Sequence, residues 1–126
     1  MIKLHELPTG PDSVVYRGDR MAGGCIVRVV TGDSSKVLDP RNDLRNHSPT
    51  GLEWGYGGAG PCQLSLALLA DAVGDALAVC HYFRFKKEVV SQVNDDTWQI
   101  RRDTIAMLVD HWDRQDFPGR YRSAAA

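Results

Sequence analysis

Residues 48–61 read Ser-Pro-Thr-Gly-Leu-Glu-Trp-Gly-Tyr-Gly-Gly-Ala-Gly-Pro, and this stretch marks the change from strand signals to helix signals. Five of the twelve glycines of the chain lie between positions 51 and 60. Pro61 suits the first position of a helix, because that position needs no backbone N–H donor. Apolar residues then recur at helical spacing from Leu64 to Val73, which predicts a helix buried over most of its surface.

The residues before this stretch carry the signals of strands and turns. Residues 25–30 are mostly β-branched. They are preceded by Gly23-Gly24 and followed by Gly32-Asp33, which is typical of a strand. Turn-forming residues at 32–35 and the apolar pair that follows predict a hairpin. We therefore predict an N-terminal antiparallel meander, with this organisation: an extended arm at 1–13, strands at 14–40, and a loop with the glycine-rich motif at 41–60.

The residues after Pro61 predict helices over 61–115, followed by a tail at 116–126. Gly74 is placed to end the first helix and Asp75 to cap the second, which gives a tight αα-hairpin. The second helix is expected from Ala76 to Val93 and a third from Asp103 or Thr104. Two further short strands are possible, at residues 52–54 and at residues 98–100, where apolar and polar residues alternate.

The segregation of strands and helices predicts the α+β class. We expect one domain with a small antiparallel sheet covered by about three helices, including the αα-hairpin. The length of 126 residues leaves no room for a second domain of ordinary size.

The composition excludes several classes of protein. Hydrophobic residues make up 43% and charged residues 25% of the chain, which is unlike disordered, collagen-like or coiled-coil sequences. The net charge of −1 gives no global reason to bind nucleic acid or an anionic membrane. No apolar run has the length of a signal peptide or a membrane span, so we expect a cytoplasmic protein without membrane contact. Three cysteines (Cys25, Cys62 and Cys80) are expected to be free thiols.

The glycine-rich stretch resembles the signature of an uncharacterised family. This domain-of-unknown-function family comprises small bacterial, archaeal and phage proteins, and its motif reads S-P-x-G-[FL]-E-W-G-Y-G-G-x-G-P-x-Q-L. The resemblance extends from Tyr16 to about Ile105, and it departs from the usual pattern at Leu52 and Cys62. Members often sit on mobile elements, which implies a role in element biology or in conflict with host defence.

The glycine-rich loop and the helix after it form the strongest candidate site, with two interpretations. In the first, the glycines only let the chain turn past Trp54 and Tyr56; in the second, the loop and the free N–H groups of the helix hold an anion. The motif is neither a Walker A loop nor a dinucleotide fingerprint. The predicted binding residues of the loop surface are His47, Glu53, Trp54, Tyr56, Gly57, Gly58, Gly60 and Gln63, with Arg20 and Lys86 as supporting charges.

Glu53 is the one carboxylate inside the motif. It could act as an acid or base beside an aromatic ring, but we favour an ion pair with Arg20 or Lys86. No catalytic residue, cofactor or metal site is predicted, since the four histidines show no metal-ligand spacing.

The sequence thus favours a small non-enzymatic binding protein of a mobile element whose partner is a host or phage protein. The alternative is a binder or enzyme for a small anionic or nucleotide-like ligand at the start of the helix. A weaker alternative is a nucleic-acid surface formed by Arg84, Lys87, Arg101 and Arg102, which the nearby acidic residues dilute.

Overall fold

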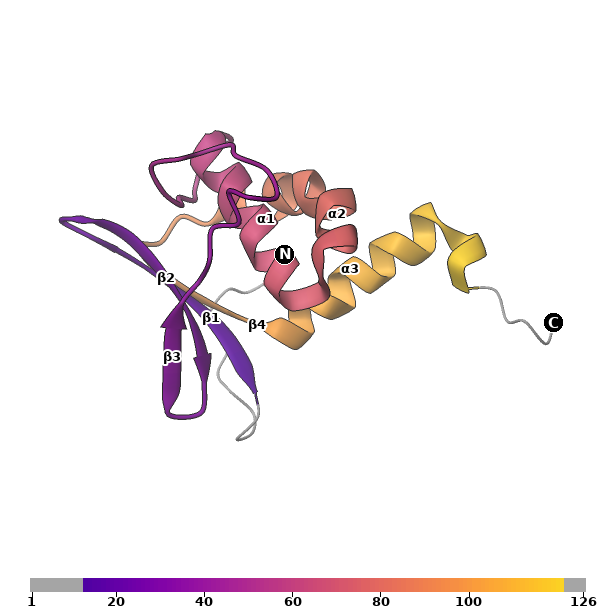
Figure 1. Cartoon of the computed structure of the whole chain (residues 1–126), viewed down its shortest axis with the longest axis horizontal. Helices are drawn as coiled ribbons and strands as arrows, with labels where there is room; N and C mark the ends of the chain where they lie inside the picture. Colours follow the sequence, from indigo (N-terminus) through magenta and orange to yellow (C-terminus); the bar gives the residue numbers. More distant parts are fainter. Residues whose placement is uncertain (1–12, 122–126) are drawn as a thin grey trace.

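The computed structural model describes residues 13–121 and contains one antiparallel sheet with helices on one of its faces (Figure 1). Strands β1 (Val14–Met21), β2 (Gly24–Thr31) and β3 (Ser34–Val37) form the predicted meander. The fourth strand, β4 (Thr97–Arg101), returns to pair with β1, so the strand order is β3-β2-β1-β4. The α+β class is confirmed, and the alternating residues 98–100 do lie in a strand.

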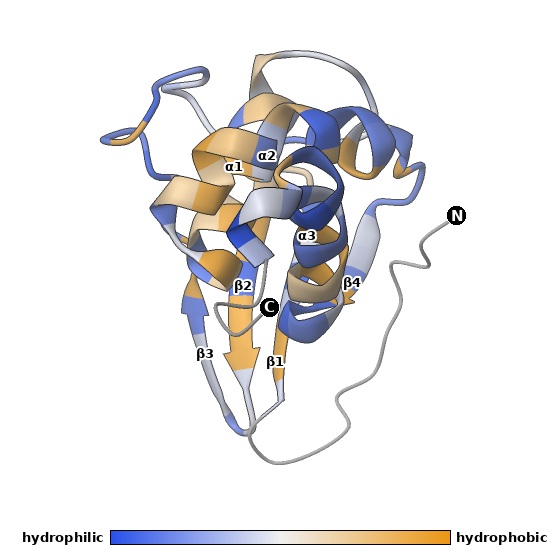
Figure 2. Cartoon of the chain, turned by 90° about the vertical axis from the view of Figure 1, so that its right-hand side faces the viewer, coloured by the Kyte–Doolittle hydropathy of each residue, from blue (hydrophilic) through white to orange (hydrophobic). Residues whose placement is uncertain are grey.

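The helical layer is formed by the chain after β3, with β4 lying between the second and third α-helices in the sequence. Helices α1 (Ala59–Val73) and α2 (Asp75–Glu88) form the αα-hairpin, and α3 (Arg102–Asp116) follows β4 directly. Two short 3-10 helices, η1 (Val90–Gln92) and η2 (Pro118–Tyr121), complete the layer. Figure 2 shows α1 coloured hydrophobic along much of its length, because this helix lies between the sheet and its neighbours. None of the described helices combines the length and apolarity that crossing a bilayer would need.

A close contact across the sheet determines the fit between β1 and β4. Gly18 of β1 pairs with Trp98 of β4, and the Trp98 indole lies directly over the glycine. A Cβ atom on Gly18 would lie 2.3 Å from the indole ring, so only glycine allows this packing. Trp98 in turn contacts Trp54 edge to face, with the ring centroids 5.5 Å apart. The core is therefore continuous from the sheet to the glycine-rich loop.

The helix boundaries differ from the predicted ones in three places. Helix α1 starts at Ala59 with Gly58 as its N-cap, so Pro61 is the third helical residue. Asp75 does not cap α2, because its carboxylate instead accepts two hydrogen bonds from Arg41, at 2.8 and 2.9 Å. Helix α2 ends at Glu88, five residues before the predicted end at Val93, and the chain turns into η1.

Two further predictions concern the loop and the chain ends. Residues 52–54 form no strand. Apart from residue 13, the predicted arm at 1–13 lies outside the described residues, as does the last part of the predicted tail, 122–126.

Candidate functional site

The loop before α1 is fastened to the helix by one buried side chain, Gln63. Its Oε1 atom accepts hydrogen bonds from the backbone N–H groups of His47 (2.7 Å) and Ser48 (3.1 Å). Its Nε2 atom donates to the backbone carbonyls of Pro40 and Arg45. Gln63 is 0% exposed, so it holds the loop in place from inside the molecule rather than offering a surface for a partner.

Trp54 fastens the other end of the loop and is also an interior residue. Its side chain is 1% exposed, and its indole N–H donates to the backbone carbonyl of Asp95 at 2.8 Å. Trp54 and Gln63 were predicted to lie on the loop surface, whereas the structure places both in the core. The sequence pattern alone does not show whether an aromatic or amide side chain faces inward or outward.

Arg20 joins three segments of the chain next to the loop. Its guanidinium donates to the Glu53 carboxylate and to the Asp96 carboxylate, each at 2.7 Å, and it lies 4.7 Å from the centre of the Trp54 ring. Glu53 therefore pairs with Arg20, which is one of the two partners that the sequence offered. The other, Lys86, lies over the Phe83 ring at 5.7 Å.

The charge on Glu53 is stabilised by these contacts. Burial raises the pKa of Glu53, but hydrogen bonds from Arg20 and Cys25 outweigh it and hold the pKa below its usual value. Burial and the neighbouring Glu53 raise the pKa of the Cys25 thiol to about 11. At neutral pH the site thus contains an ionised carboxylate paired with an arginine, and a protonated thiol.

The clustered glycines have different reasons to be glycine. A Cβ on Gly60 would lie 2.6 Å from the Cβ of Glu53, and one on Gly58 would lie 2.4 Å from the Tyr56 ring. Gly51 and Gly55 have φ angles of 143° and 89°, in the region that favours glycine. An added Cβ at Gly57 would meet open space, so neither packing nor a left-handed backbone requires glycine there.

A groove of about 450 Å³ lies between the end of the β1–β2 hairpin and the glycine-rich loop. Its walls come from three segments: the hairpin end at 23–25, the loop at 48–53, and the residues around the start of α1 at 56–60. A smaller hollow of about 170 Å³ shares Cys25, Gly51 and Leu52 with the groove and continues along β2 to Leu38. Sequence reasoning missed the contribution of residues 23–25, because a Gly-Gly pair before a strand signals only a turn.

The exposed residues of the predicted site lie on this loop or beside it. Tyr56 lines the groove and is 52% exposed, with its ring packed over Gly58. The His47 Nε2 atom lies 2.8 Å from the Tyr82 hydroxyl, so this histidine links the loop to α2. Of the predicted loop surface, Glu53, Tyr56 and Gly60 line the groove, whereas His47 lies elsewhere on the loop.

The predicted basic residues are engaged in pairs with acidic side chains. Arg84 forms an ion pair with Glu88 on the same helix, and the Arg101 Nε atom lies 3.1 Å from the Asp103 carboxylate. Arg102 donates to the Asp71 carboxylate at 2.6 Å and to the Tyr16 hydroxyl at 3.0 Å. Three of the four predicted cations thus have a carboxylate beside them, which weakens the electrostatic case for a nucleic-acid surface.

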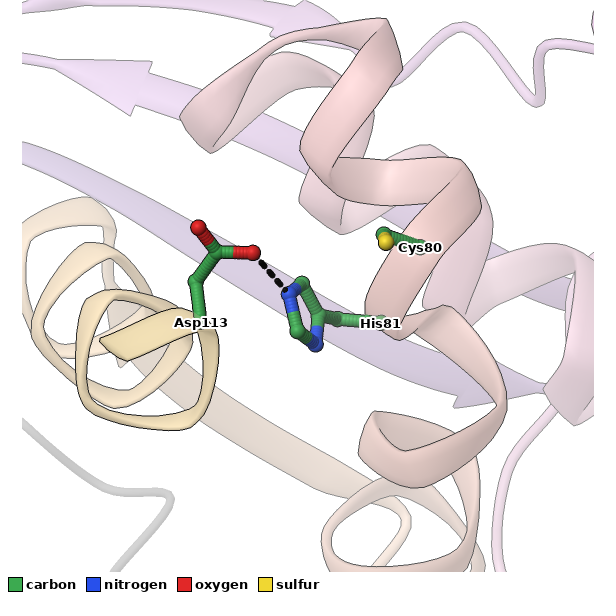
Figure 3. A group of neighbouring side chains, drawn as sticks. All are labelled: Cys80, His81 and Asp113. Atoms are coloured by element: carbon green, nitrogen blue, oxygen red, sulfur yellow. Dashed lines mark hydrogen bonds and ion pairs between the residues drawn. The ribbon is translucent and has the colours of Figure 1, made fainter. Parts of the chain in front are cut away.

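Cys80, His81 and Asp113 form the one group among the described residues whose donor atoms could converge on a metal ion (Figure 3). The ligand atoms lie within 4.8 Å of one another, and His81 Nε2 lies 2.7 Å from Asp113 Oδ1. The sequence offered Cys80 and His81 as neighbours on a helix but gave no signal for Asp113, which comes from α3.

The Asp113 carboxylate is already engaged by protein groups. It accepts hydrogen bonds from the Arg120 guanidinium and the Tyr121 hydroxyl, besides its contact with His81. The Tyr121 and His81 bonds lower the pKa of Asp113. His81 and Asp113 are 2% and 1% exposed. A metal ion would have to displace these bonds, so the arrangement favours a structural link between α2, α3 and η2.

Residues 16–112 match a family of unknown function, DUF6166. No curated protein and no solved structure matches the chain.

Proposed function

The chain belongs to the family of unknown function DUF6166, and we propose that it is a small non-enzymatic binding protein that uses the groove beside the glycine-rich loop. The observation that carries this proposal is the groove itself. It is formed by segments far apart in the sequence, and its loop wall is held at both ends by buried side chains, Trp54 and Gln63. A groove with fixed walls is typical of a binding site, because little ordering is needed when the ligand enters.

The chemistry of the groove favours binding over catalysis. Glu53 is ion-paired with Arg20, so it is a poor proton acceptor for a substrate. The Cys25 thiol is protonated at neutral pH and is therefore a poor nucleophile. The half-exposed Tyr56 ring supplies the kind of amphipathic surface that anchors protein interfaces.

A second candidate is a small anionic or nucleotide-like ligand at the start of α1. Ala59 and Gly60 line the groove, and the first turn of α1 has neither an acidic residue nor a side-chain cap. Free backbone N–H groups at a helix start attract anions. Pro61 lacks an N–H group, however, and Glu53 places a negative charge in the same groove. A thermal-shift series with inorganic phosphate and nucleotides distinguishes this candidate, because a ligand of the native state raises Tm.

The resemblance of the motif adds a setting for the proposed function. The resemblance implies a setting on mobile elements, and we propose that the partner is a host or phage protein and that binding interferes with a host defence or regulatory system. The proposed site of action is the cytoplasm.

Groove-filling variants test the proposed function. An added Cβ at Gly23 meets open space and Gly23 lines the groove, so Gly23→Trp fills the groove without a clash at the backbone. Thr50→Trp does the same from the exposed opposite wall. Gly119→Trp is the matched control, because a side chain there also meets open space but lies in η2.

The measurement is quantitative capture of host and phage proteins by each immobilised variant, with circular dichroism to check folding. We expect at least one protein that the wild type and Gly119→Trp retain and that both groove variants lose. Equal capture by all four folded proteins would exclude the groove as the binding surface.

A further inference from the structure

One edge of β2 has no neighbouring strand over its first residues. The ladder between β2 and β3 runs from Thr31 to Arg28, and the Leu38 N–H then donates to the Val27 carbonyl at 2.8 Å. The chain turns away after Leu38. Residues 24–26 of β2 therefore extend beyond β3 on this side of the sheet.

The register indicates which backbone groups face that open edge. The Val27 carbonyl points toward the β3 side. In a strand the N–H and C=O groups of alternate residues point to the same side, so those of Cys25 point there as well. The other side agrees with this, because the N–H of Arg20, the β1 partner of Cys25, points away from β2 toward Asp96. Within residues 13–121, no backbone hydrogen bond to Cys25 is present on the open side.

The open edge faces the groove and its continuation. Cys25 lines both the large groove and the smaller hollow, and the hollow follows β2 from Cys25 to Val27. Across the gap stand Gly51 and Leu52, which also line both spaces. The space thus runs lengthwise beside a strand edge that is unpaired over residues 24–26, about 7 Å, and it continues beside Val27.

We infer that the groove binds an extended peptide segment of a partner protein, which adds to the sheet as a strand along the open edge of β2. This inference rests on the proposed function and names the kind of ligand. The Cys25 N–H and C=O groups would exchange two hydrogen bonds with one peptide residue, which is the main-chain recognition used in strand addition. Thr50, Gly51 and Leu52 line the groove together with Cys25, so a ligand at this edge lies between two walls, which suits a single extended segment better than the sheet of a second copy.

The groove walls also indicate the peptide's side chains. The hollow beside Val27 is lined by Val37, Leu38 and Leu52, so it suits an apolar side chain. Near Cys25 the Glu53 carboxylate is ion-paired with Arg20, so its charge is offset and selects neither an acidic nor a basic side chain. We therefore expect an extended segment with an apolar anchor.

A library of random decapeptides displayed on phage tests the inference against the immobilised full-length chain. Selected peptides are synthesised, and each backbone amide is N-methylated in turn. Because the Cys25 carbonyl accepts from one peptide N–H and the Val27 carbonyl is already bonded to Leu38, strand addition predicts that binding weakens about tenfold at one N-methylated position and less at the positions next to it. Cys25→Pro removes the donor at the open edge, whereas Cys25→Val keeps it and is the matched control. The Pro variant should lose binding about tenfold relative to the Val variant.

Each outcome decides the inference separately from the proposed function. Loss of binding at one N-methylated position, together with loss of binding in Thr50→Trp, supports strand addition even if Cys25→Pro fails to fold. Selection of no peptide, or of peptides whose binding is insensitive to N-methylation at every position, overturns it. The proposed function would still stand in that case if Gly23→Trp and Thr50→Trp lose a captured partner that Gly119→Trp retains.

Discussion

Replacing Gln63 by leucine tests whether this buried amide is the anchor of the loop. Leucine has nearly the same volume, so the change removes hydrogen-bonding groups while leaving little cavity. The substitution should destabilise the protein and release the loop from α1. Because Gln63 is fully buried and cannot touch a partner at the surface, this effect would come from the loss of its hydrogen bonds to the loop.

The magnitude follows from the groups that lose their partner. Two N–H groups, of His47 and Ser48, and two carbonyls, of Pro40 and Arg45, bond to the Gln63 amide. A buried backbone group without a partner costs about 1–3 kcal/mol, and relaxation of the loop toward water recovers part of that cost. We therefore expect a loss of about 3 kcal/mol, which lowers Tm by about 10 °C for a domain of this size.

Urea unfolding and amide hydrogen exchange measure the two effects. Gln115→Leu is the matched control, because Gln115 is an exposed residue of α3 and its replacement should change stability by less than about 0.5 kcal/mol. In Gln63→Leu the amides of His47 and Ser48 should exchange faster at urea concentrations where the fold persists. A stability equal to that of the Gln115→Leu protein, with unchanged exchange at both amides, would refute the anchoring role.

Four other substitutions test the packing and electrostatics of the protein. Gly58→Ala should lose about 1–3 kcal/mol in urea unfolding, because its methyl group meets the neighbouring tyrosine ring, whereas Gly57→Ala should be neutral; equal values would contradict this. Gly18→Ala should cost more than Gly58→Ala, since its methyl group meets the buried Trp98 indole; a smaller loss of Tm would argue against that contact. Because the pKa of Glu53 is lowered in the fold, its ion pair stabilises the protein above the unfolded pKa and is lost as pH falls through the folded value. Glu53→Gln should therefore flatten the fall of stability below about pH 4.5, and an unchanged pH profile would exclude this role for the ion pair.

The fold could be predicted from the sequence because its signals are local. The β-branched run at 25–30, the turn residues after it and the helical spacing after Pro61 are each read over short windows, and the structure has the corresponding elements. The end of α2 was missed for a physical reason. The Gly55 N–H donates to the Val90 carbonyl at 3.1 Å, so the chain there bonds to the loop instead of continuing the helix, and no local pattern encodes that contact.

The candidate site was only partly predictable, because its residues meet through tertiary contacts. The glycine-rich stretch indicated the right loop, but the opposite wall comes from residues 23–25, about thirty positions earlier in the chain. The inward orientation of Trp54 depends on Trp98 and Asp95, both distant in sequence. A motif therefore identified the segment, whereas burial determined which of its residues can reach a partner.

The residues that support the loop and the residues that line the groove should respond differently to substitution, and this difference links stability to function. Gln63 holds the loop without reaching the groove, so Gln63→Leu should weaken stability and binding together, since a loosened wall must be ordered again when the ligand enters. Thr50 is exposed and lines the groove, so Thr50→Trp should remove binding while stability stays within about 0.5 kcal/mol of the wild type. If both variants lost stability and binding in the same proportion, the groove would be only a consequence of folding. Loss of binding at unchanged stability in Thr50→Trp alone is what a binding surface on a preorganised scaffold requires.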